Sequence, residues 1–455
     1  MRVSLPVWTG QYGPHPNRSS SQTVPPTPDQ RVQSALVTPP NSTDLAKASR
    51  RIVGSLFAIQ GLVLAAVIAM STVMSIVAAD LTGNPSWAGA PAAALQLAVA
   101  GASFLWGATW DRTGRRIGLT LALSAGLLGT VAAAAAVELR SIWLLGLGIL
   151  AVGAARAGSQ LSRFTAAEVS QPDARGRAIS IVVWGGTLGA IGGPLLVGPS
   201  SRAGMALGLG ELTGPVAIAI PLAALAVLVA YAGLRPEPLE LSRRIEENVS
   251  DPATEGSARS LSTLLRIPGV VVAIMTVVIA TTVMTMLMGI TSLYMHDHGQ
   301  ALSGISVVFA AHTLGMFAFA PLAGRMADRV GRGPVMISGA LITLLSLIVA
   351  PASHQTAVLV VGLFLLGLGW SLSFVAGSAL LSDQLSATER SRTQGANDLL
   401  IGLASGIASL GSGAVYGAQG YGVVSLLSGF LMVPAVVLSA WWTFGRRAVR
   451  PAAAD

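Results

Sequence analysis

From Ile52 onward, long apolar runs alternate with short polar connections. A helix needs about 20 apolar residues to cross the roughly 30 Å of hydrocarbon in a bilayer. Runs of that length fall near residues 52–79, 88–109, 117–137, 141–162, 177–198, 212–234, 269–294, 302–323, 334–353, 356–381, 393–417 and 421–444. Charged residues make up only 11% of the chain, against about 25% in soluble proteins. The sequence therefore predicts an all-α membrane protein with twelve spanning helices.

The basic residues lie almost entirely on one side of this predicted topology. Counting alternate connections, every lysine and arginine except Arg140, Arg156 and Arg202 belongs to the side that holds both termini. Short cytoplasmic loops collect such residues, so we expect both termini in the cytoplasm. The net charge of +8 is then topological and gives no sign of nucleic-acid binding. Lys47 is the only lysine, which indicates a GC-rich bacterial source and hence a plasma membrane.

Polar segments divide the chain into five parts. Residues 1–49 are rich in proline and serine and are predicted to be a disordered cytoplasmic tail. Residues 50–236 and 267–445 each hold six predicted spans, and 237–266 form a polar cytoplasmic linker between them. Residues 446–455 are a second cytoplasmic tail.

The two six-helix parts carry copies of one motif. The connection after the second span reads GATWDRTGRR from Gly107, and the connection after the eighth reads GRMADRVGRG from Gly324. Four residues recur 217 positions later, namely Asp111, Arg112, Gly114 and Arg115 as Asp328, Arg329, Gly331 and Arg332. Equivalent positions in two halves indicate an internal duplication. Parallel six-helix repeats are one of the main architectures of secondary transporters.

With these residues, the chain resembles the major facilitator superfamily. The hallmark of that family matches Gly107, Asp111, Arg112, Gly114, Arg115 and Arg116. The second copy matches from Gly324 through Arg332 but has Gly333 where a further basic residue is common. The resemblance covers roughly residues 50–445 and implies two six-helix pseudo-repeats. It also implies that Asp111 and Asp328 are gating residues, with Asp111 meeting the N-terminal dipole of the eleventh span. The alternative is a cytoplasmic turn with topogenic arginines.

The fifth predicted span carries a second resemblance. Gly189, Gly193, Pro194 and Gly198 are similar to a packing motif of drug–proton antiporters, although Val197 stands where that motif has a glycine. Those antiporters tend to carry an arginine early in the fourth span, and this chain has none there. The alternative is ordinary small-residue packing between membrane helices.

Ionisable residues inside a bilayer cost about 2.5–3.5 kcal/mol on insertion scales, so they are candidates for function. Arg156 in the fourth span is a candidate for holding an anionic group, or else a snorkelling arginine. Asp398 in the eleventh span is a candidate proton acceptor, or else half of a structural ion pair. His312 in the eighth span is a candidate titrating group, or else a hydrogen-bonded core residue.

The resemblance implies a central cavity built by the first, fourth, seventh and tenth spans. Its expected lining comprises Gln60, Met70, Met74, Gln160, Thr281, Met284, Thr285, Met288, Trp370, Ser373 and Phe374. Methionine and aromatic side chains repack around varied apolar ligands. This lining favours a hydrophobic or amphipathic solute, and the alternative for each residue is helix packing or lipid contact.

Nothing in the sequence indicates an enzyme. The chain has no cysteine, five histidines and no phosphate-binding Walker A motif. The leading hypothesis is a monomeric, proton-coupled exporter of hydrophobic or drug-like compounds, without a cofactor or metal ion and in contact with membrane lipid. One alternative is uptake of a nutrient or metabolite by proton symport or facilitated diffusion. Another is a membrane sensor that transports nothing.

Overall fold

The computed structural model describes residues 42–171, 174–247 and 259–445, apart from the side chains of residues 42, 43, 104, 107, 108, 111, 246, 247, 261, 387, 388 and 390–392. The chain divides into two units, residues 1–45 and 46–455, and the second unit contains the two six-helix halves. Most of the predicted N-terminal tail, the centre of the linker and the C-terminal tail lie outside the described residues.

The described residues form helices throughout. The first half contains α2 (Ser42–Thr82), η1 (Pro85–Trp87), α3 (Ala90–Thr113), α4 (Arg115–Glu138), α5 (Ile142–Glu168), α6 (Arg175–Leu195), α7 (Val197–Ala206), α8 (Thr213–Ala217) and α9 (Ala219–Gly233). The linker contains α10 (Pro238–Glu247) and α11 (Leu261–Leu264). The second half contains α12 (Pro268–Asp297), α13 (Leu302–Phe317), α14 (Ala320–Arg329), α15 (Arg332–Val349), η3 (Ala350–Ala352), α16 (Thr356–Asp383), α17 (Ala387–Gln419), α18 (Tyr421–Ala440) and η4 (Trp441–Gly445).

The twelve predicted spans are all helical in the structure. Eleven helical segments of the described chain are long and apolar enough to cross a membrane, and the remaining predicted span, 88–109, coincides with the 24-residue helix α3. Two parts of the predicted polar segments are helical in the structure. Helix α2 begins at Ser42, inside the predicted tail, and Asp44 in its first turn favours a helix N-terminus. The linker, predicted only as a polar connection, contains the helices α10 and α11.

Prolines explain three interruptions inside the spans. A proline has no N–H to donate to the carbonyl four residues before it. Pro199, Pro221 and Pro321 leave the carbonyls of Leu195, Ala217 and Phe317 without that bond, and these are the last residues of α6, α8 and α13. Each span therefore continues after a short break.

The two repeated motifs form equivalent turns. Gly114 precedes α4 with φ of 83°, and Gly331 precedes α15 with φ of 105°. L-residues with a side chain rarely adopt this region, so glycine fits both turns. Arg115 and Arg332 are then the first residues of their helices.

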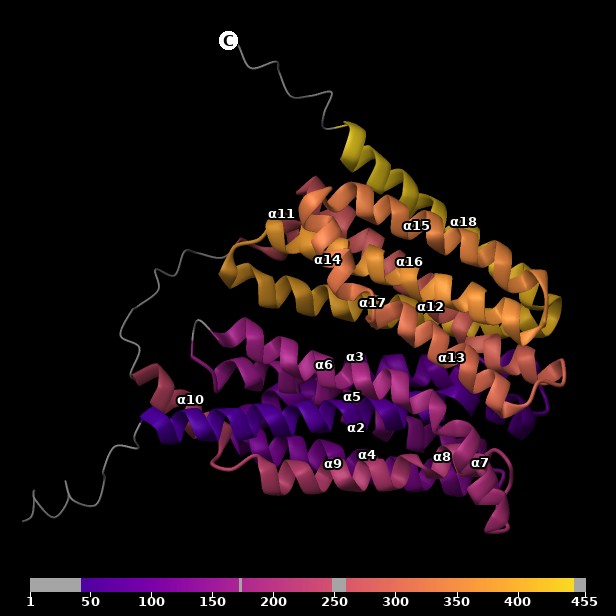
Figure 1. The fold of residues 1–455 in the computed structure, drawn as a ribbon, viewed down its shortest axis with the longest axis horizontal. Coiled ribbons are helices and arrows are strands. Elements are labelled where there is room, and N and C mark those ends of the chain that lie inside the picture. Colours follow the sequence, from indigo (N-terminus) through magenta and orange to yellow (C-terminus); the bar gives the residue numbers. More distant parts are fainter. Residues whose placement is uncertain (1–41, 172–173, 248–258, 446–455) are drawn as a thin grey trace, which may run out of the picture. The chain divides into compact units, whose positions relative to one another are not determined.

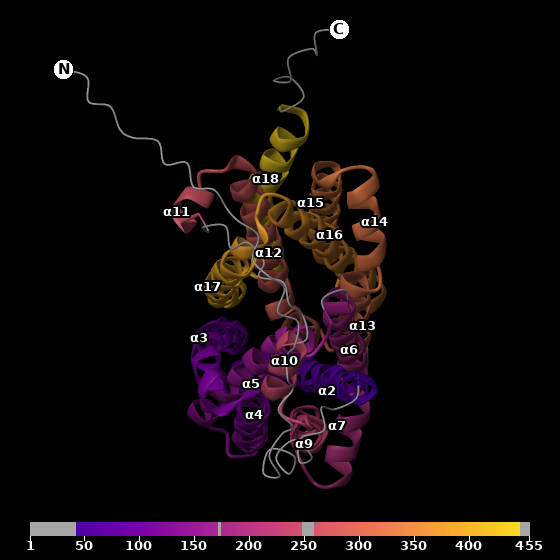
Figure 2. The same ribbon diagram turned by 90° about the vertical axis from the view of Figure 1, so that its left-hand side faces the viewer.

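The two halves contact each other along α3 with α17 and along α13 with α6 and α7. In both views α17 lies beside α3 and α13 beside α6 (Figure 1, Figure 2). We call the helix ends near residues 83–89, 298–301 and 420 the Asn84 end, and those near 114, 331 and 384–386 the Gly114 end. Small residues allow close approach near the Asn84 end. A Cβ on Gly89 would lie 1.7 Å from the carbonyl oxygen of Ser409.

Candidate functional site

A cavity of about 230 Å³ lies between the two halves. Its lining comes from α2, α3, α5 and α6 of the first half and from α12 and α13 of the second. The residues are Leu64, Ile68, Met70, Ser71, Met74, Ser75, Ala88, Pro91, Ala92, Leu95, Gln96, Ile149, Arg156, Ala190, Met284, Thr285, Met288, Gly289, Phe309, His312, Thr313, Met316 and Phe317. Most of these side chains are apolar, so the cavity suits an apolar or amphipathic ligand.

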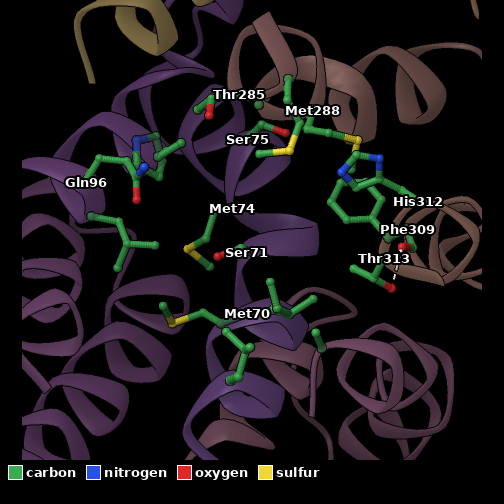
Figure 3. A pocket seen from close by; sticks show the side chains of 18 of the residues that line it. Met70, Ser71, Met74, Ser75, Gln96, Thr285, Met288, Phe309, His312 and Thr313 are labelled. Atoms are coloured by element: carbon green, nitrogen blue, oxygen red, sulfur yellow. Dashed lines mark hydrogen bonds between the residues drawn. The ribbon is translucent and has the colours of Figure 1, made fainter. Parts of the chain in front are cut away.

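Figure 3 shows how the two halves face each other across this space. Gln96 lies on one side, and Met288, Phe309 and His312 lie on the other, with Met74 between them. Five methionines line the cavity, namely Met70, Met74, Met284, Met288 and Met316. Their flexible thioethers let the wall adapt to ligands of different shape.

The cavity is bounded toward the Asn84 end by contacts between the halves. The Ser75 hydroxyl lies 2.5 Å from the Ser292 hydroxyl, and both residues are buried. The Ser409 hydroxyl donates to the carbonyl of Gly89 at 3.0 Å. Toward the Gly114 end, among the described side chains, one ion pair joins the halves, between Arg163 and Asp398 at 3.4 Å. The closely packed contact between halves is thus at the Asn84 end.

Arg156 lies on α5 and lines the cavity, as a candidate for holding an anion should. Gly153, three residues earlier, packs against α3, with a Cβ there only 2.5 Å from that of Ala98. This close packing brings α5 against α3, the helix that carries Gln96, which is another lining residue. The Arg156 Nε atom is buried and has no hydrogen-bond partner in the described part of the chain.

His312 lies on α13 and also lines the cavity. Its Nδ1 is 2.9 Å from the carbonyl oxygen of Leu363 on α16. Gly367 permits this packing, because a Cβ there would lie 2.2 Å from the carbonyl oxygen of His312. If Nδ1 carries the proton and donates it to Leu363, the other nitrogen of the ring remains an acceptor.

Asp398 is not part of the cavity lining. It is exposed near the Gly114 end of α17, where it pairs with Arg163 and accepts a hydrogen bond from Gln394 at 3.0 Å. Arg163 belongs to the first half, so this pair bridges the two halves.

The structure places the other candidates outside the lining. Gln60 accepts a hydrogen bond from Ser159, so it joins α2 to α5. Gln160 is half-buried and is absent from the lining. Trp370 donates to Thr281 at 2.9 Å and stacks on Phe374 at 4.7 Å. Contrary to expectation, the tenth span contributes nothing to this lining, because glycines draw α16 tightly onto α13 and α15.

The lining includes residues that the sequence prediction missed. Gln96 on α3 and Phe309, Thr313 and Phe317 on α13 come from spans that were not expected to contribute. Ser75 had a detectable signal, because Ser292 follows it by 217 positions, the offset of the motif copies. Asp80 and Asp297 share the same offset.

The motif copies hold equivalent ion pairs. Arg115 binds Glu168 at 3.1 Å, and Arg332 binds Asp383 at 3.1 Å. Each arginine thus joins the start of the third spanning helix of its half to the end of the fourth. Arg332 also binds Asp328. Glu237 accepts hydrogen bonds from the N–H groups of Arg115 and Arg116.

Arg112, Arg329 and Gly324 complete the described part of the motif copies. Arg112 and Arg329 are exposed, and Gly324 lies within α14. Gly107 and the Asp111 side chain lie outside the described part, so the gating role of Asp111 stays a prediction.

The glycines of the fifth span pack mainly against α2. A Cβ on Gly189 would lie 2.0 Å from the carbonyl oxygen of Gly61, and one on Gly193 would lie 2.7 Å from that of Ala65. Pro194 is buried inside α6, and a Cβ on Gly198 would lie 3.7 Å from the Cβ of Ser303 on α13. The motif thus brings α6 close to α2, with its last glycine against the eighth span.

A tight contact outside the spans anchors the linker. Arg259 donates two side-chain hydrogen bonds of 2.8 Å to Glu389, which also accepts from the N–H of Ser386. The Arg259 guanidinium, together with the Ser386 amide, holds the pKa of the Glu389 carboxyl well below its usual range. The linker is thereby fixed to the start of α17.

Comparison with known proteins agrees with this architecture. The model of the Major Facilitator Superfamily matches residues 56–299 and again 273–455. The MFS-type transporter YdeG of Bacillus subtilis (strain 168) is 32% identical over 380 residues, 82% of this chain and 87% of that protein. The riboflavin transporter RfnT of Brucella anthropi is 28% identical over 326 residues, 71% of this chain and 78% of that protein.

Two further similarities are more limited. The multidrug resistance protein MdtL of Klebsiella pneumoniae is 32% identical over 96 residues, which is 21% of this chain and 24% of that protein. The fold is similar to the inward-facing, unoccupied structure of a bacterial homologue of the human lysosomal transporter Spinster. That match has a TM-score of 0.63 at 15% identity and covers 91% of this chain and 100% of the other.

Proposed function

The chain belongs to the Major Facilitator Superfamily, and on that basis we propose that it exports small, largely apolar solutes from the cytoplasm in exchange for protons. The observation that carries this proposal is the methionine-rich cavity between the two halves. A site at the interface of two repeats, alternately exposed by rocking of the halves, is how such folds move a solute.

The distribution of basic residues supports an orientation of the chain in the membrane that is compatible with export. Arginines cluster in the connections at the Gly114 end, and on this basis we assign that end to the cytoplasm. The tight contacts between the halves lie at the opposite, outer end. An exporter loads its solute in a conformation that is shut toward the outside, and this arrangement suits that step.

Two residues, His312 and Asp398, are candidates for carrying the proton. His312 faces the cavity, where the other ionisable residue of the lining is Arg156. Asp398 lies nearer the cytoplasm, where protonation would remove its charge and weaken the pair with Arg163. We assign the exchanged proton to His312, because a solute and a proton that compete for one cavity are coupled directly.

Transport into inverted vesicles tests export and its coupling. The vesicle lumen is acidified, and accumulation of a fluorescent apolar dye is followed for the wild type, His312→Gln and Asp398→Asn. We expect the wild type to accumulate the dye and to lose this accumulation when the pH gradient is removed. Accumulation should be lost in His312→Gln and should persist in Asp398→Asn. The reverse order of the variants would assign the proton to Asp398, and pH-independent flux would remove the proton from the mechanism.

The longer match to a riboflavin transporter favours a second candidate function, the transport of a heteroaromatic nutrient. The match to the multidrug protein MdtL spans a much smaller part of the chain. Uptake of labelled riboflavin into right-side-out vesicles separates the two proposals. Saturable uptake there, without dye export from cells, would favour the nutrient, whereas absence of both fluxes would favour a sensor.

A further inference from the structure

We propose that Arg156 binds the anionic group of the transported solute, so that the cavity is specific for small amphipathic anions such as aromatic carboxylates or sulfonates. This inference rests on the proposed transport function and names the class of solute. Its basis is the charge distribution around the cavity.

The lining carries an arginine and no carboxylate. Beyond Arg156 and His312, its polar side chains are the neutral Ser71, Ser75, Gln96, Thr285 and Thr313. The fixed positive charge of Arg156 therefore has no compensating charge among the residues that line the cavity.

The helices that line the cavity supply no hidden counter-charge either. No aspartate or glutamate occurs in residues 45–79, 81–110, 139–167, 174–210, 256–296 or 298–327, which contain the spanning parts of α2, α3, α5, α6, α12 and α13. Three of the carboxylates that begin or end these stretches bind other groups. Asp80 pairs with Arg140 at 3.1 Å, Glu168 with Arg115 at 3.1 Å, and Asp297 accepts from Tyr416 at 2.6 Å.

The guanidinium itself is left with unused hydrogen-bonding capacity. The buried Nε of Arg156 has no partner in the described part of the chain. A buried N–H without a partner is unfavourable, and an arginine fork matches the two oxygens of a carboxylate or sulfonate. An anionic solute would supply both the missing charge and the missing acceptor.

The rest of the cavity selects the body of the solute. Met74, Met288 and Phe309 present sulfur and aromatic surface rather than further charge. Such surface binds a flat or branched apolar group and accepts different shapes. A molecule with one anionic end and an apolar body satisfies both parts of the site, and its charge prevents it from crossing the bilayer unaided.

Binding measurements on the purified full chain test this specificity. Isothermal titration calorimetry in nanodiscs of neutral phosphatidylcholine compares 2-naphthoate with its uncharged counterpart, 2-naphthamide. We expect the wild type to bind naphthoate at least about tenfold more tightly than naphthamide, as a charge-assisted hydrogen bond requires. Equal affinities in the wild type would overturn the proposal without any variant.

Substitutions test whether Arg156 is the source of the preference for naphthoate. Arg156→Gln should lose the preference for naphthoate while still binding naphthamide, and Arg156→Lys should retain part of it. Arg163→Gln is the matched control, because Arg163 lies on the same helix but is not part of the lining. A preference that survives in Arg156→Gln, or that disappears in Arg163→Gln alone, would contradict the assignment.

Two further arms separate the inference from its alternatives. If inverted vesicles accumulate naphthamide but not naphthoate, the proposed export is supported and the proposed specificity for anions is contradicted. If naphthoate binds through Arg156 but neither compound is transported under any gradient, the anion site is supported and the proposed transport function is contradicted. Replacing phosphatidylcholine with phosphatidylglycerol tests a lipid headgroup as the ligand, and competitive loss of naphthoate binding would overturn the assignment to a solute.

Discussion

The hydroxyl oxygens of Ser75 and Ser292 lie 2.5 Å apart, although the two residues are 217 positions apart in the chain. That spacing equals the offset between the two motif copies, so the serines are equivalent residues of the two repeats. Equivalent residues in direct contact lie on the pseudo-twofold axis that relates the halves. The contact of α2 with α12 at the Asn84 end of the cavity is therefore a point at which the duplicated halves meet.

This contact predicts a reversible lock. The chain has no cysteine, so a Ser75→Cys/Ser292→Cys double variant forms at most one intramolecular disulfide. Oxidation should bond the two halves at the Asn84 end and stop flux, because that end can no longer open. Flux measured before and after reduction tests this, with each single variant as a control. Unchanged flux in the fully oxidised double variant would show that the Asn84 end does not open during transport.

Close packing of α3 against α17 predicts a steric effect at Gly89. An added Cβ would meet the backbone of Ser409 at 1.7 Å, which side-chain movement cannot relieve. Gly89→Ala should destabilise the folded state by about 1–3 kcal/mol, the range for overpacking. Thermal unfolding of the purified protein measures this. Gly101→Ala, within α3 and with no atom within 4 Å of the added Cβ, should unfold at or above the wild-type temperature.

The linker contact predicts a pH-dependent stability. Arg259 and the Ser386 amide lower the pKa of Glu389 from its usual 4.5. A lowered pKa in the folded state contributes stability that is present above the unfolded pKa and is lost as the pH falls through the folded value. Glu389→Gln should therefore lower the unfolding temperature at pH 7, with a difference that shrinks as the pH falls below about 4.5. The exposed Glu240→Gln serves as the control, and a difference that grows at acid pH would contradict this account.

The sequence predicted the architecture well because hydropathy and charge are local signals. Helix length follows from bilayer thickness, and the repeat offset identified two halves before any contact was known. Arg156 and His312 were identified because ionisable residues deep within a span are costly and rare. Both line the cavity.

The sequence did not reveal how each helix is rotated about its own axis, because that rotation depends on packing between spans. Gln60 and Trp370 looked like cavity residues by type, yet they bond to Ser159 and Thr281 on neighbouring helices. Apart from His312 on α13, the nearly uniform apolar faces of α3 and α13 gave no indication that these helices would line the cavity. Glycine contacts, such as Gly367 against His312, decide these arrangements.

Access to the cavity from each side of the membrane tests alternating transport most directly. Met74→Cys in the cysteine-free chain places one reactive thiol in the cavity lining. In oriented proteoliposomes, a membrane-impermeant maleimide should label it from the Gly114 side at rest and from the Asn84 side only during turnover. Labelling from one side under all conditions, or from both sides equally at rest, would contradict a cavity that opens alternately to the two faces.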